Sequence, residues 1–376
     1  ALHGHAMGAS AALELIAKRL RSTVAERGAN AIGALASPTT TLEEMHLLAK
    51  LVRGLGSENV DFRLRQTDFS ADGKTTGTPW LGMKVSEIGE LDCALVVGSF
   101  LRKDHPLLAN RFRQAAKRGQ QLHLLHIAAD HPLIDRVNRI VVAPSGLVGG
   151  LASIARAVLE AKQQPLPEHL RNIAVTDAAQ SVAQSLARGR KIGVFLGNTA
   201  QQHPNAAQLH VLAQTIAGAT GGRVGFFGEA SNSVGGHLAR CLPGPNGLNV
   251  REMLAEPRNA YLLFNCEPEL DVHHSAEATA AMHAAKFVVA MTPFRTTAVN
   301  YAHVILPITP YSETSGTFVN TEGRMQSFNA VVRPLGDSRP GWKVLRVLAN
   351  VLDIAGFEQD TSESVRDEVC QPAAIE

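Results

Sequence analysis

The chain has 376 residues, of which 45% are hydrophobic, and its 36 basic and 34 acidic residues leave a formal charge of +2. This length and apolar content predict two hydrophobic cores rather than one. The small basic excess argues against nucleic acid as a partner. The sequence contains no run of about 20 apolar residues and no secretory signal pattern, so contact with a membrane is expected only through partner proteins.

Short apolar runs alternate with helical segments along the chain, which is typical of parallel α/β proteins. Near-continuous apolar runs of this length fit strands that are covered by helices on both faces. The predicted strands are Ala31–Ala36, Ala94–Gly98, Leu122–Ile127, Ile140–Val142, Lys191–Leu196, Arg223–Phe227, Ala260–Asn265, Phe287–Met291 and His303–Leu306.

The first helix with clear ends is predicted over residues 38–54. Thr40 or Thr41 can cap its start, and Glu43 or Glu44 lies three residues later, as a capping box requires. Gly54 is the predicted left-handed stop.

A second helix is predicted from His105 to Gly119, so that Ala94–Ile127 forms a complete βαβ unit. Basic residues line this helix and the turn before it. A solvated helix face is the default interpretation of such charges, but a nucleotide phosphate or an acidic neighbouring protein could also bind here. These residues are Arg102, Lys103, Arg111, Arg113, Lys117 and Arg118.

The four cysteines are too scattered for a metal or cluster site, because no CxxC pair occurs. Their apolar surroundings predict free, structural thiols in a reducing compartment. They are Cys93, Cys241, Cys266 and Cys370.

Other motifs with known chemistry are absent. Neither GxGxxG nor GxxxxGK[ST] occurs, and Gly73–Thr75 is predicted to be a polar turn. His273 and His274 lie near Asp271 and His283, but adjacent histidines on a helix point about 100° apart, so no metal site is predicted there.

Residues 313–324 combine hydroxyls, an amide, carboxylates and two glycines after a predicted strand that ends at Leu306. Such a composition lets the backbone turn sharply while side chains satisfy it. From the residues alone, a ligand-binding loop and a hydrogen-bonded structural knot remain equally open.

Ala302–Pro307 followed by Glu313–Arg324 resembles the end of the second α/β domain of molybdopterin oxidoreductases. Val97–Leu108 resembles the Rossmann-type βαβ unit of the same family, and Ile32–Gly54 resembles the start of its central domain. These likenesses span roughly residues 12–350.

Within that group, Leu101–Leu108 and Glu313–Arg324 look most like the large iron–sulfur subunit of bacterial NADH:quinone oxidoreductase, respiratory complex I. The resemblance implies an α/β fold of two Rossmann-like, three-layer αβα lobes of the formate dehydrogenase/DMSO reductase type. It implies a first lobe over residues 1–67 plus 191–335, an inserted lobe over 68–190, and a C-terminal helix and tail over 336–376.

Departures from the family pattern accompany these likenesses. Thr67 stands near the position of the metal ligand, His126 replaces an acidic residue that anchors a nucleotide, and His303 replaces an aspartate. We therefore expect a vestigial pocket, with no catalytic residue, no metal ligand and no molybdenum. The pocket residues that the resemblance implies are Thr67, Gly98, Asn198, Thr292, Glu313, Thr314, Gly316 and Arg324.

The function implied is a scaffold within an electron-transfer subunit, which carries electrons from NADH toward quinone through [2Fe–2S] and [4Fe–4S] clusters outside this chain. The expected partners are other hydrophilic-arm subunits of complex I, and the expected location is peripheral, on the cytoplasmic side of the bacterial inner membrane. Two alternatives stay open: an active molybdopterin-dependent oxidoreductase, and a nucleotide-binding module that uses the inherited crevice.

Overall fold

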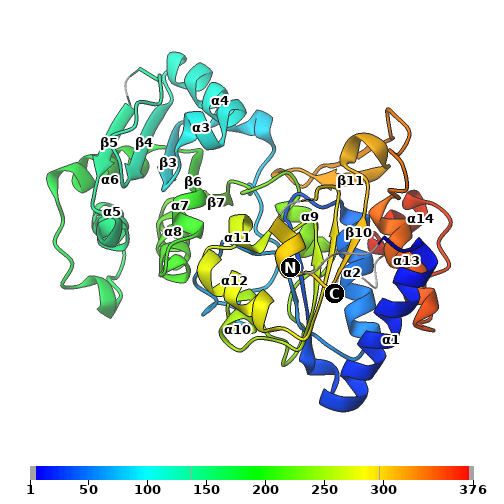
Figure 1. Cartoon of the computed structure of the whole chain (residues 1–376). Coiled ribbons are helices and arrows are strands. Elements are labelled where there is room, and N and C mark those ends of the chain that lie inside the picture. The colour runs from blue at the N-terminus through cyan, green and yellow to red at the C-terminus, as the bar shows by residue number, and fades with distance from the viewer. Residues whose placement is uncertain (1–5, 136, 296, 372–376) are drawn as a thin grey trace. The chain divides into compact units, whose positions relative to one another are not determined.

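The computed structural model describes residues 6–135, 137–295 and 297–371. The outermost residues of the predicted first lobe and C-terminal tail, 1–5 and 372–376, lie outside this range. The chain divides into two compact units (Figure 1). Unit 1 comprises Ala1–Arg65, Ala230–Asn320 and Arg324–Glu376, and unit 2 comprises Gln66–Glu229 and Thr321–Gly323.

Unit 1 contains a five-stranded parallel sheet of order β10-β9-β8-β1-β2 and a separate antiparallel pair, β11-β12. The strands are β1 (Ile32–Ala36), β2 (Val60–Asp61), β8 (Ala260–Phe264), β9 (Phe287–Thr292), β10 (Val304–Pro307), β11 (Gly316–Val319) and β12 (Met325–Phe328).

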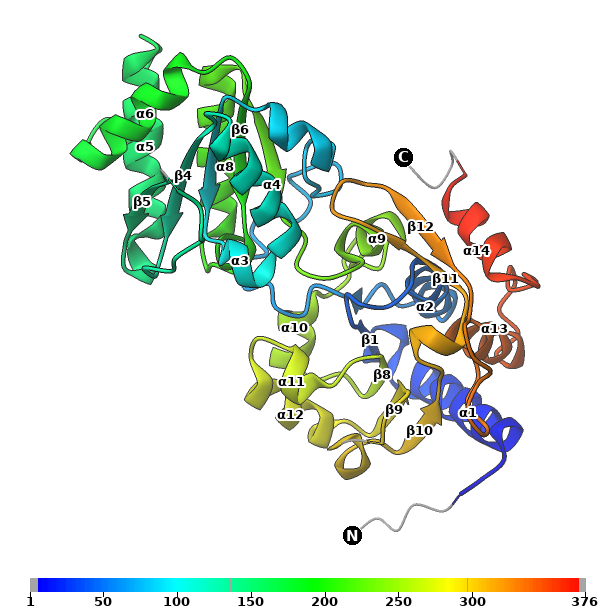
Figure 2. The same cartoon turned by 90° about the horizontal axis from the view of Figure 1, so that it is seen from above.

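Helices cover both faces of the unit 1 sheet. Figure 2 shows α1, α2 and α13 on one side, and α10, α11 and α12 on the other. The helices of unit 1 are α1 (Ala9–Arg27), α2 (Leu42–Gly54), α9 (Ser233–Leu238), α10 (Val250–Ala255), α11 (Pro268–Asp271), α12 (Ser275–Ala284), α13 (Gly341–Val351) and α14 (Ser362–Val369).

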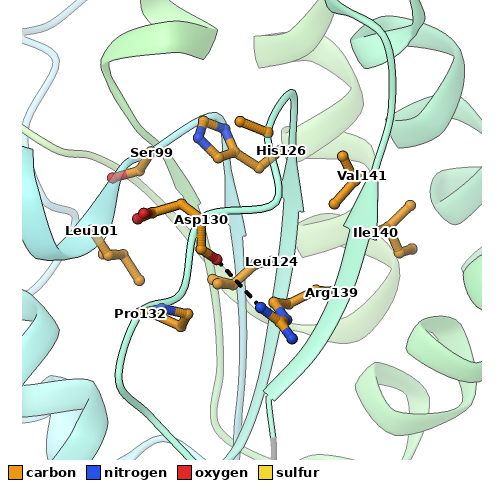
Figure 3. A pocket seen from close by; sticks show the side chains of 10 residues that line it. Ser99, Leu101, Leu124, His126, Asp130, Pro132, Arg139, Ile140 and Val141 are labelled. Atoms are coloured by element: carbon orange, nitrogen blue, oxygen red, sulfur yellow. Dashed lines mark hydrogen bonds between the residues drawn. The ribbon is translucent and has the colours of Figure 1, made fainter.

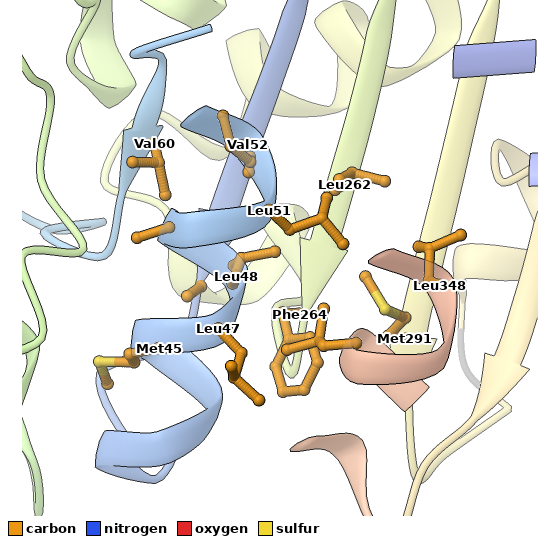
Figure 4. Close-up of a cluster of buried hydrophobic side chains, with 14 of the residues drawn as sticks. Met45, Leu47, Leu48, Leu51, Val52, Val60, Leu262, Phe264, Met291 and Leu348 are labelled. Atoms are coloured by element: carbon orange, nitrogen blue, oxygen red, sulfur yellow. The ribbon is translucent and has the colours of Figure 1, made fainter. Parts of the chain in front are cut away.

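The core of unit 1 forms where α2 and α13 meet the sheet (Figure 4). Leu48 and Leu51 of α2 lie with Phe264 of β8 and Leu348 of α13 in one cluster of fully buried side chains. α2 is buried on nearly all sides, because its apolar residues from Leu42 to Val52 all belong to this core cluster.

Unit 2 contains a five-stranded parallel sheet of order β5-β4-β3-β6-β7. Its strands are β3 (Cys93–Val97), β4 (Gln121–His126), β5 (Val137–Val141), β6 (Ile192–Leu196) and β7 (Arg223–Phe226). Its helices are α3 (Leu101–Asp104), α4 (Pro106–Lys117), α5 (Leu147–Ala161), α6 (Asp177–Arg188), α7 (Asn198–Gln201) and α8 (Ala206–Thr220).

Two hydrophobic clusters lie on opposite faces of the unit 2 sheet. Leu95 and Val97 of β3 contribute to the cluster that includes α5, α6 and α8. Ala94 and Val96 contribute to the cluster that includes Phe112 of α4. Alternate residues of one strand therefore face different helix layers, and the predicted three-layer α/β fold is confirmed. Among the described helices, none is long and apolar enough to cross a membrane.

All nine predicted strands are present, each within a few residues of its predicted ends. The predicted capping box is also present, because Thr41 Oγ1 accepts from Glu44 N–H and Glu44 Oε2 accepts from Thr41 N–H. The predicted stop at Gly54 is wrong. The left-handed residue is Gly56 (φ 87°), whereas a side chain at Gly54 would collide with Ile354.

The unit boundary differs from the predicted residue 191. β6 pairs with β3, and β7 pairs with β6, so residues 191–229 extend the sheet of unit 2. The segment 336–371 belongs to unit 1 because Leu345 and Leu348 enter its core. A strand's apolar run does not reveal which sheet the strand joins.

Candidate functional site

The strand order of unit 2 reverses between β3 and β6. The chain runs outward from β3 through β4 to β5, then returns to the other side of β3 with β6 and β7. In open α/β sheets, ligands bind outside the carboxyl ends of the strands at such a switch point. Val97 and Leu196 pair at these ends, and Gly98 and Gly197 follow them.

Glycine is required at both positions. Gly98 has φ 63°, and a Cβ there would lie 2.6 Å from Ala200 N. A Cβ at Gly197 would lie 2.3 Å from Ser99 Cβ. Thr199 N–H donates to Gly98 O at 2.9 Å, so the two loops interlock at the switch point.

Asn198 begins α7 directly after this turn. Its Oδ1 atom is buried, and no described residue donates a hydrogen bond to it. A buried acceptor without a donor costs about 1–3 kcal/mol. The switch point of unit 2 therefore offers an unused acceptor to a ligand that carries an N–H or O–H group.

Ser99 and His105 form a hydrogen-bond relay beside this point, and both are buried. His105 Nε2 lies 3.1 Å from Gly228 O, and a carbonyl oxygen only accepts, so Nε2 carries the proton. His105 Nδ1 then accepts from Ser99 Oγ at 3.2 Å. Burial lowers the pKa of His105, which favours this neutral form.

A small cavity lies at the carboxyl end of β4, lined by Ser99, His126, Asp130 and Arg139 (Figure 3). Its volume of about 10 Å³ has room for about one water molecule. Arg139 Nη1 donates to Asp130 O at 3.4 Å. This cavity is too small for a nucleotide.

His126 lies where the family places an acidic residue. Its ring packs edge-on against Phe100 with centroids 4.2 Å apart. Neither ring nitrogen has a hydrogen-bond partner among the described residues, and burial lowers the pKa of His126. The side chain is therefore neutral at pH 7 and retains both a donor and an acceptor for a ligand.

Thr67, near the expected metal-ligand position, is also buried in unit 2. Its Oγ1 donates to Gln202 O at 2.8 Å, and Gln202 directly follows α7. Three of the predicted pocket residues, Thr67, Gly98 and Asn198, thus meet around α7. The Thr67 hydroxyl proton is used by the backbone, so Thr67 acts here as a structural contact.

The switch point of unit 1 lies between β1 and β8. Ser37 N–H donates to Phe264 O at 3.0 Å, and Asn265 (φ 49°) donates its N–H to Met291 O at 2.9 Å. Ser37 Oγ lies 2.9 Å from Thr39 Oγ1. These bonds tie the loops of unit 1 to each other.

The other predicted pocket residues lie in unit 1, and the hydrogen bonds of the polar ones join them to different neighbours. Thr292 Oγ1 accepts from Phe294 N–H at 3.2 Å, and Glu313 Oε2 accepts from Leu335 N–H at 2.9 Å. Thr314 Oγ1 donates to Ser315 O at 3.1 Å, and Arg324 N–H donates to Asn320 Oδ1 at 2.9 Å. These contacts favour the structural knot among the two interpretations of residues 313–324.

Packing explains Gly316, because a Cβ there would lie 2.6 Å from Thr41 Cγ2. Beside it, Thr317 N–H donates to Glu43 Oε2 at 2.8 Å. Burial raises the pKa of Glu43. Sequence reasoning considered Glu43 only as a possible capping residue. It therefore missed that Glu43, on α2, accepts a hydrogen bond from the backbone of β11 and so ties the two elements together.

Sequence reasoning also missed Ser99 and His105 as parts of the unit 2 switch point. Ser99 could have been found, since it directly follows the glycine at a strand end. The relay to Gly228 could not, because Gly228 lies far along the chain.

A family model for molybdopterin oxidoreductase matches residues 10–351. The match covers most of the sequence, and the chain belongs to the molybdopterin oxidoreductase family. One curated relative, named "Putative formate dehydrogenase", from Staphylococcus aureus strain MRSA252, is 22% identical over 96% of this chain and 43% of its own length. Probable oxidoreductase YjgC of Bacillus subtilis strain 168 is 24% identical over 97% of this chain and 44% of its own length. The chain thus spans under half the length of these relatives.

Solved structures share the fold. Acetylene hydratase from Pelobacter acetylenicus matches with a TM-score of 0.70 and 14% identity, over 94% of this chain and 60% of that one. A chain of the formyltransferase/hydrolase complex FhcABCD from Methylorubrum extorquens, solved in complex with methylofuran, matches with a TM-score of 0.67 and 16% identity. That match covers 93% of this chain and 97% of the other.

The expectation that this fold binds no molybdenum is wrong. Family membership over residues 10–351 implies a molybdopterin cofactor with its metal. Asn198 Oδ1, which is buried without a donor among the described residues, is a hydrogen-bond acceptor available to such a cofactor at the switch point of unit 2. The changes at Thr67 and His126 are therefore variations within a cofactor-binding family.

Proposed function

We propose that this chain is the α/β part of a molybdopterin-dependent oxidoreductase of the formate dehydrogenase type. The family match and the relatives named for formate dehydrogenase support this proposal. The observation that carries it is the buried, unpartnered Asn198 Oδ1 at the carboxyl edge of the unit 2 sheet.

The chain's own groups would bind and orient the nucleotide end of the cofactor. Asn198 Oδ1 would accept from an N–H or O–H donor, and Gly98 and Gly197 keep side chains away from the turn. Ser99, whose proton is directed to His105, would present oxygen lone pairs. When bound, the cofactor and its metal would supply two-electron redox chemistry.

The test uses the full-length protein purified from its native host. We expect stoichiometric molybdenum or tungsten by elemental analysis, a fluorescent pterin after oxidation, and formate-dependent reduction of a viologen dye. Absence of both metal and pterin would refute the proposal. If metal and pterin are present but formate is not oxidised, the cofactor part of the proposal stands and formate is not the substrate.

A variant tests the role of Asn198 separately. Asn198→Leu keeps the approximate size but removes the acceptor, and we expect it to lower pterin retention about tenfold, the effect of about 1.4 kcal/mol. Asn110→Leu, on the exposed side of α4, is the matched control. If both variants retain equal amounts of pterin, Asn198 does not contribute to cofactor binding.

A second candidate is the large iron–sulfur subunit of NADH:quinone oxidoreductase, favoured by the sequences of Leu101–Leu108 and Glu313–Arg324. The chain would then serve as a scaffold for hydrophilic-arm subunits, held peripherally on the cytoplasmic side of the inner membrane. Iron–sulfur absorbance and NADH oxidation that copurify with the full-length protein would support this candidate over the first. The third candidate, a nucleotide-binding module, requires saturable micromolar binding of a guanine nucleotide by calorimetry.

A further inference from the structure

The outer face of the α3–α4 segment carries a dense group of basic side chains. Leu108, Phe112 and Ala115 of α4 enter the core of unit 2, which leaves the opposite side of the helix in solvent. The basic residues on that side are all exposed: Arg102, Lys103, Arg111, Arg113, Lys117 and Arg118. We call these six residues together with Leu107 the α4 basic face.

The charge of this face is concentrated and not neutralised locally. Residues 101–118 hold six basic side chains and one acidic side chain, Asp104, a formal excess of five positive charges. Because the whole chain carries only +2, the remaining residues are acidic overall. None of the six cations forms an ion pair with an acidic side chain of the described residues.

Helix stability does not account for this arrangement. Cations at the end of a helix interact favourably with its dipole, which explains Lys117 and Arg118. Arg111 and Arg113 lie in the middle of α4, where the dipole gives no such benefit. Four like charges within eight residues repel one another, so their placement costs stability unless a partner neutralises them.

Leu107 adds an apolar element to the same face. The residue is 81% exposed in the first turn of α4. Leu107, Arg111, Gln114 and Arg118 follow at helical spacing, so the leucine continues a stripe of basic and polar residues. An exposed apolar side chain next to an arginine is typical of protein–protein interfaces.

We propose that the α4 basic face docks an acidic polypeptide, whose carboxylates meet the arginines while an apolar side chain covers Leu107. Four of the six cations are arginines, which bind carboxylates through two parallel hydrogen bonds. A nucleic acid is disfavoured, since its phosphates offer no apolar side chain to cover the exposed Leu107.

The test measures peptide binding to the full chain by fluorescence anisotropy. One probe is a glutamate peptide with leucine at every fourth position. It has about 16 residues, which is long enough for four helical turns. The second probe has glutamate only. We expect affinity for both peptides to fall about tenfold between about 0.05 and 0.2 M salt.

Variants locate the binding. Arg111→Glu/Lys117→Glu is expected to weaken both peptides at least about tenfold. Leu107→Ser is expected to weaken the leucine-containing peptide about fivefold and leave the glutamate-only peptide unchanged. Arg171→Glu/Arg188→Glu, which makes the same charge change at exposed positions elsewhere in unit 2, is expected to leave binding unchanged. Circular dichroism confirms that each variant is folded.

Three results would overturn the proposal. Equal weakening by the Arg171/Arg188 control would show a general charge effect. Tighter binding of an oligothymidylate of matched charge would assign the face to nucleic acid. Salt-dependent self-association in sedimentation experiments that Arg111→Glu/Lys117→Glu abolishes would assign it to a second copy of the chain.

Discussion

The two units bury ionisable side chains against similar parallel sheets but satisfy them differently. In unit 1, the Glu44 carboxylate accepts from Thr41 N–H at 3.1 Å and from Thr41 Oγ1 at 2.9 Å. In unit 2, His123 and His126 are buried with no partner for either ring nitrogen among the described residues. The buried Glu44 carboxylate thus has its partners within unit 1, whereas the two imidazoles of unit 2 leave ring nitrogens that a ligand or water must satisfy. Single buried polar atoms without a partner among the described residues also occur in unit 1, for example Thr40 Oγ1 and Trp342 Nε1.

The largest effect is expected from breaking a buried ion pair of unit 1. Asp61 is fully buried, and its Oδ1 accepts from Arg63 Nε at 2.9 Å while its Oδ2 accepts from Val250 N–H at 3.2 Å. Asp61→Ala should lower the free energy of unfolding by about 4 kcal/mol in denaturant titrations. Glu90→Ala, which breaks an exposed pair with Lys191, should change nothing measurable. A similar loss of unfolding free energy in both variants would contradict the expected difference between a buried and an exposed ion pair.

The pH dependence of unit 1 stability should reflect Glu44. Burial raises the pKa of Glu44 from 4.5 to about 7. Between these values the unfolded chain has lost the proton that the folded unit still holds, so the free energy of unfolding falls as pH rises, by about 3 kcal/mol over the interval. Glu44→Gln should remove this fall in denaturant titrations at a series of pH values. An unchanged slope would show that Glu44 is ionised in the folded unit.

His123 should give unit 2 the opposite dependence. Burial lowers its pKa from 6.5 to about 4, so between these values the unfolded chain holds a proton that the folded unit lacks. The free energy of unfolding therefore rises as pH rises, by about 3 kcal/mol over the interval. His123→Leu should stabilise unit 2 most near pH 4 and remove the rise. A variant less stable than the wild type at pH 4 would indicate a hidden hydrogen bond to His123.

The smallest change in stability is expected from a substitution at the switch point of unit 2. Gly98→Ala forces a side chain into a left-handed conformation and toward Ala200 N, at an expected cost of about 2 kcal/mol. Gly149→Ala, at a helical position with open space around it, should be neutral or slightly stabilising. Equal thermal midpoints for the two variants would mean that the turn relaxes freely.

Nine of the ten parallel strands were predictable, and most of them are continuous apolar runs such as Phe287–Thr292, buried along their whole length. β2 was not predicted because Val60–Asp61 has only two residues, and β12 was not because Met325–Phe328 is largely exposed. At the candidate site, Gly98 and Asn198 followed from family motifs. The relay from Ser99 through His105 to Gly228 could not be predicted, because it joins residues that are distant in sequence.

The insertion of unit 2 into unit 1 has a consequence for synthesis on the ribosome. β1 pairs with β8 in the register Ile32 to Ala260, and most of unit 2 lies between them. At translation rates of about 5–20 residues per second, β1 waits roughly 10–50 s for its neighbour. During that time its edge is open to wrong pairing, while most of unit 2, being contiguous, emerges and collapses first. We therefore expect nascent chains of this protein to need shielding at β1.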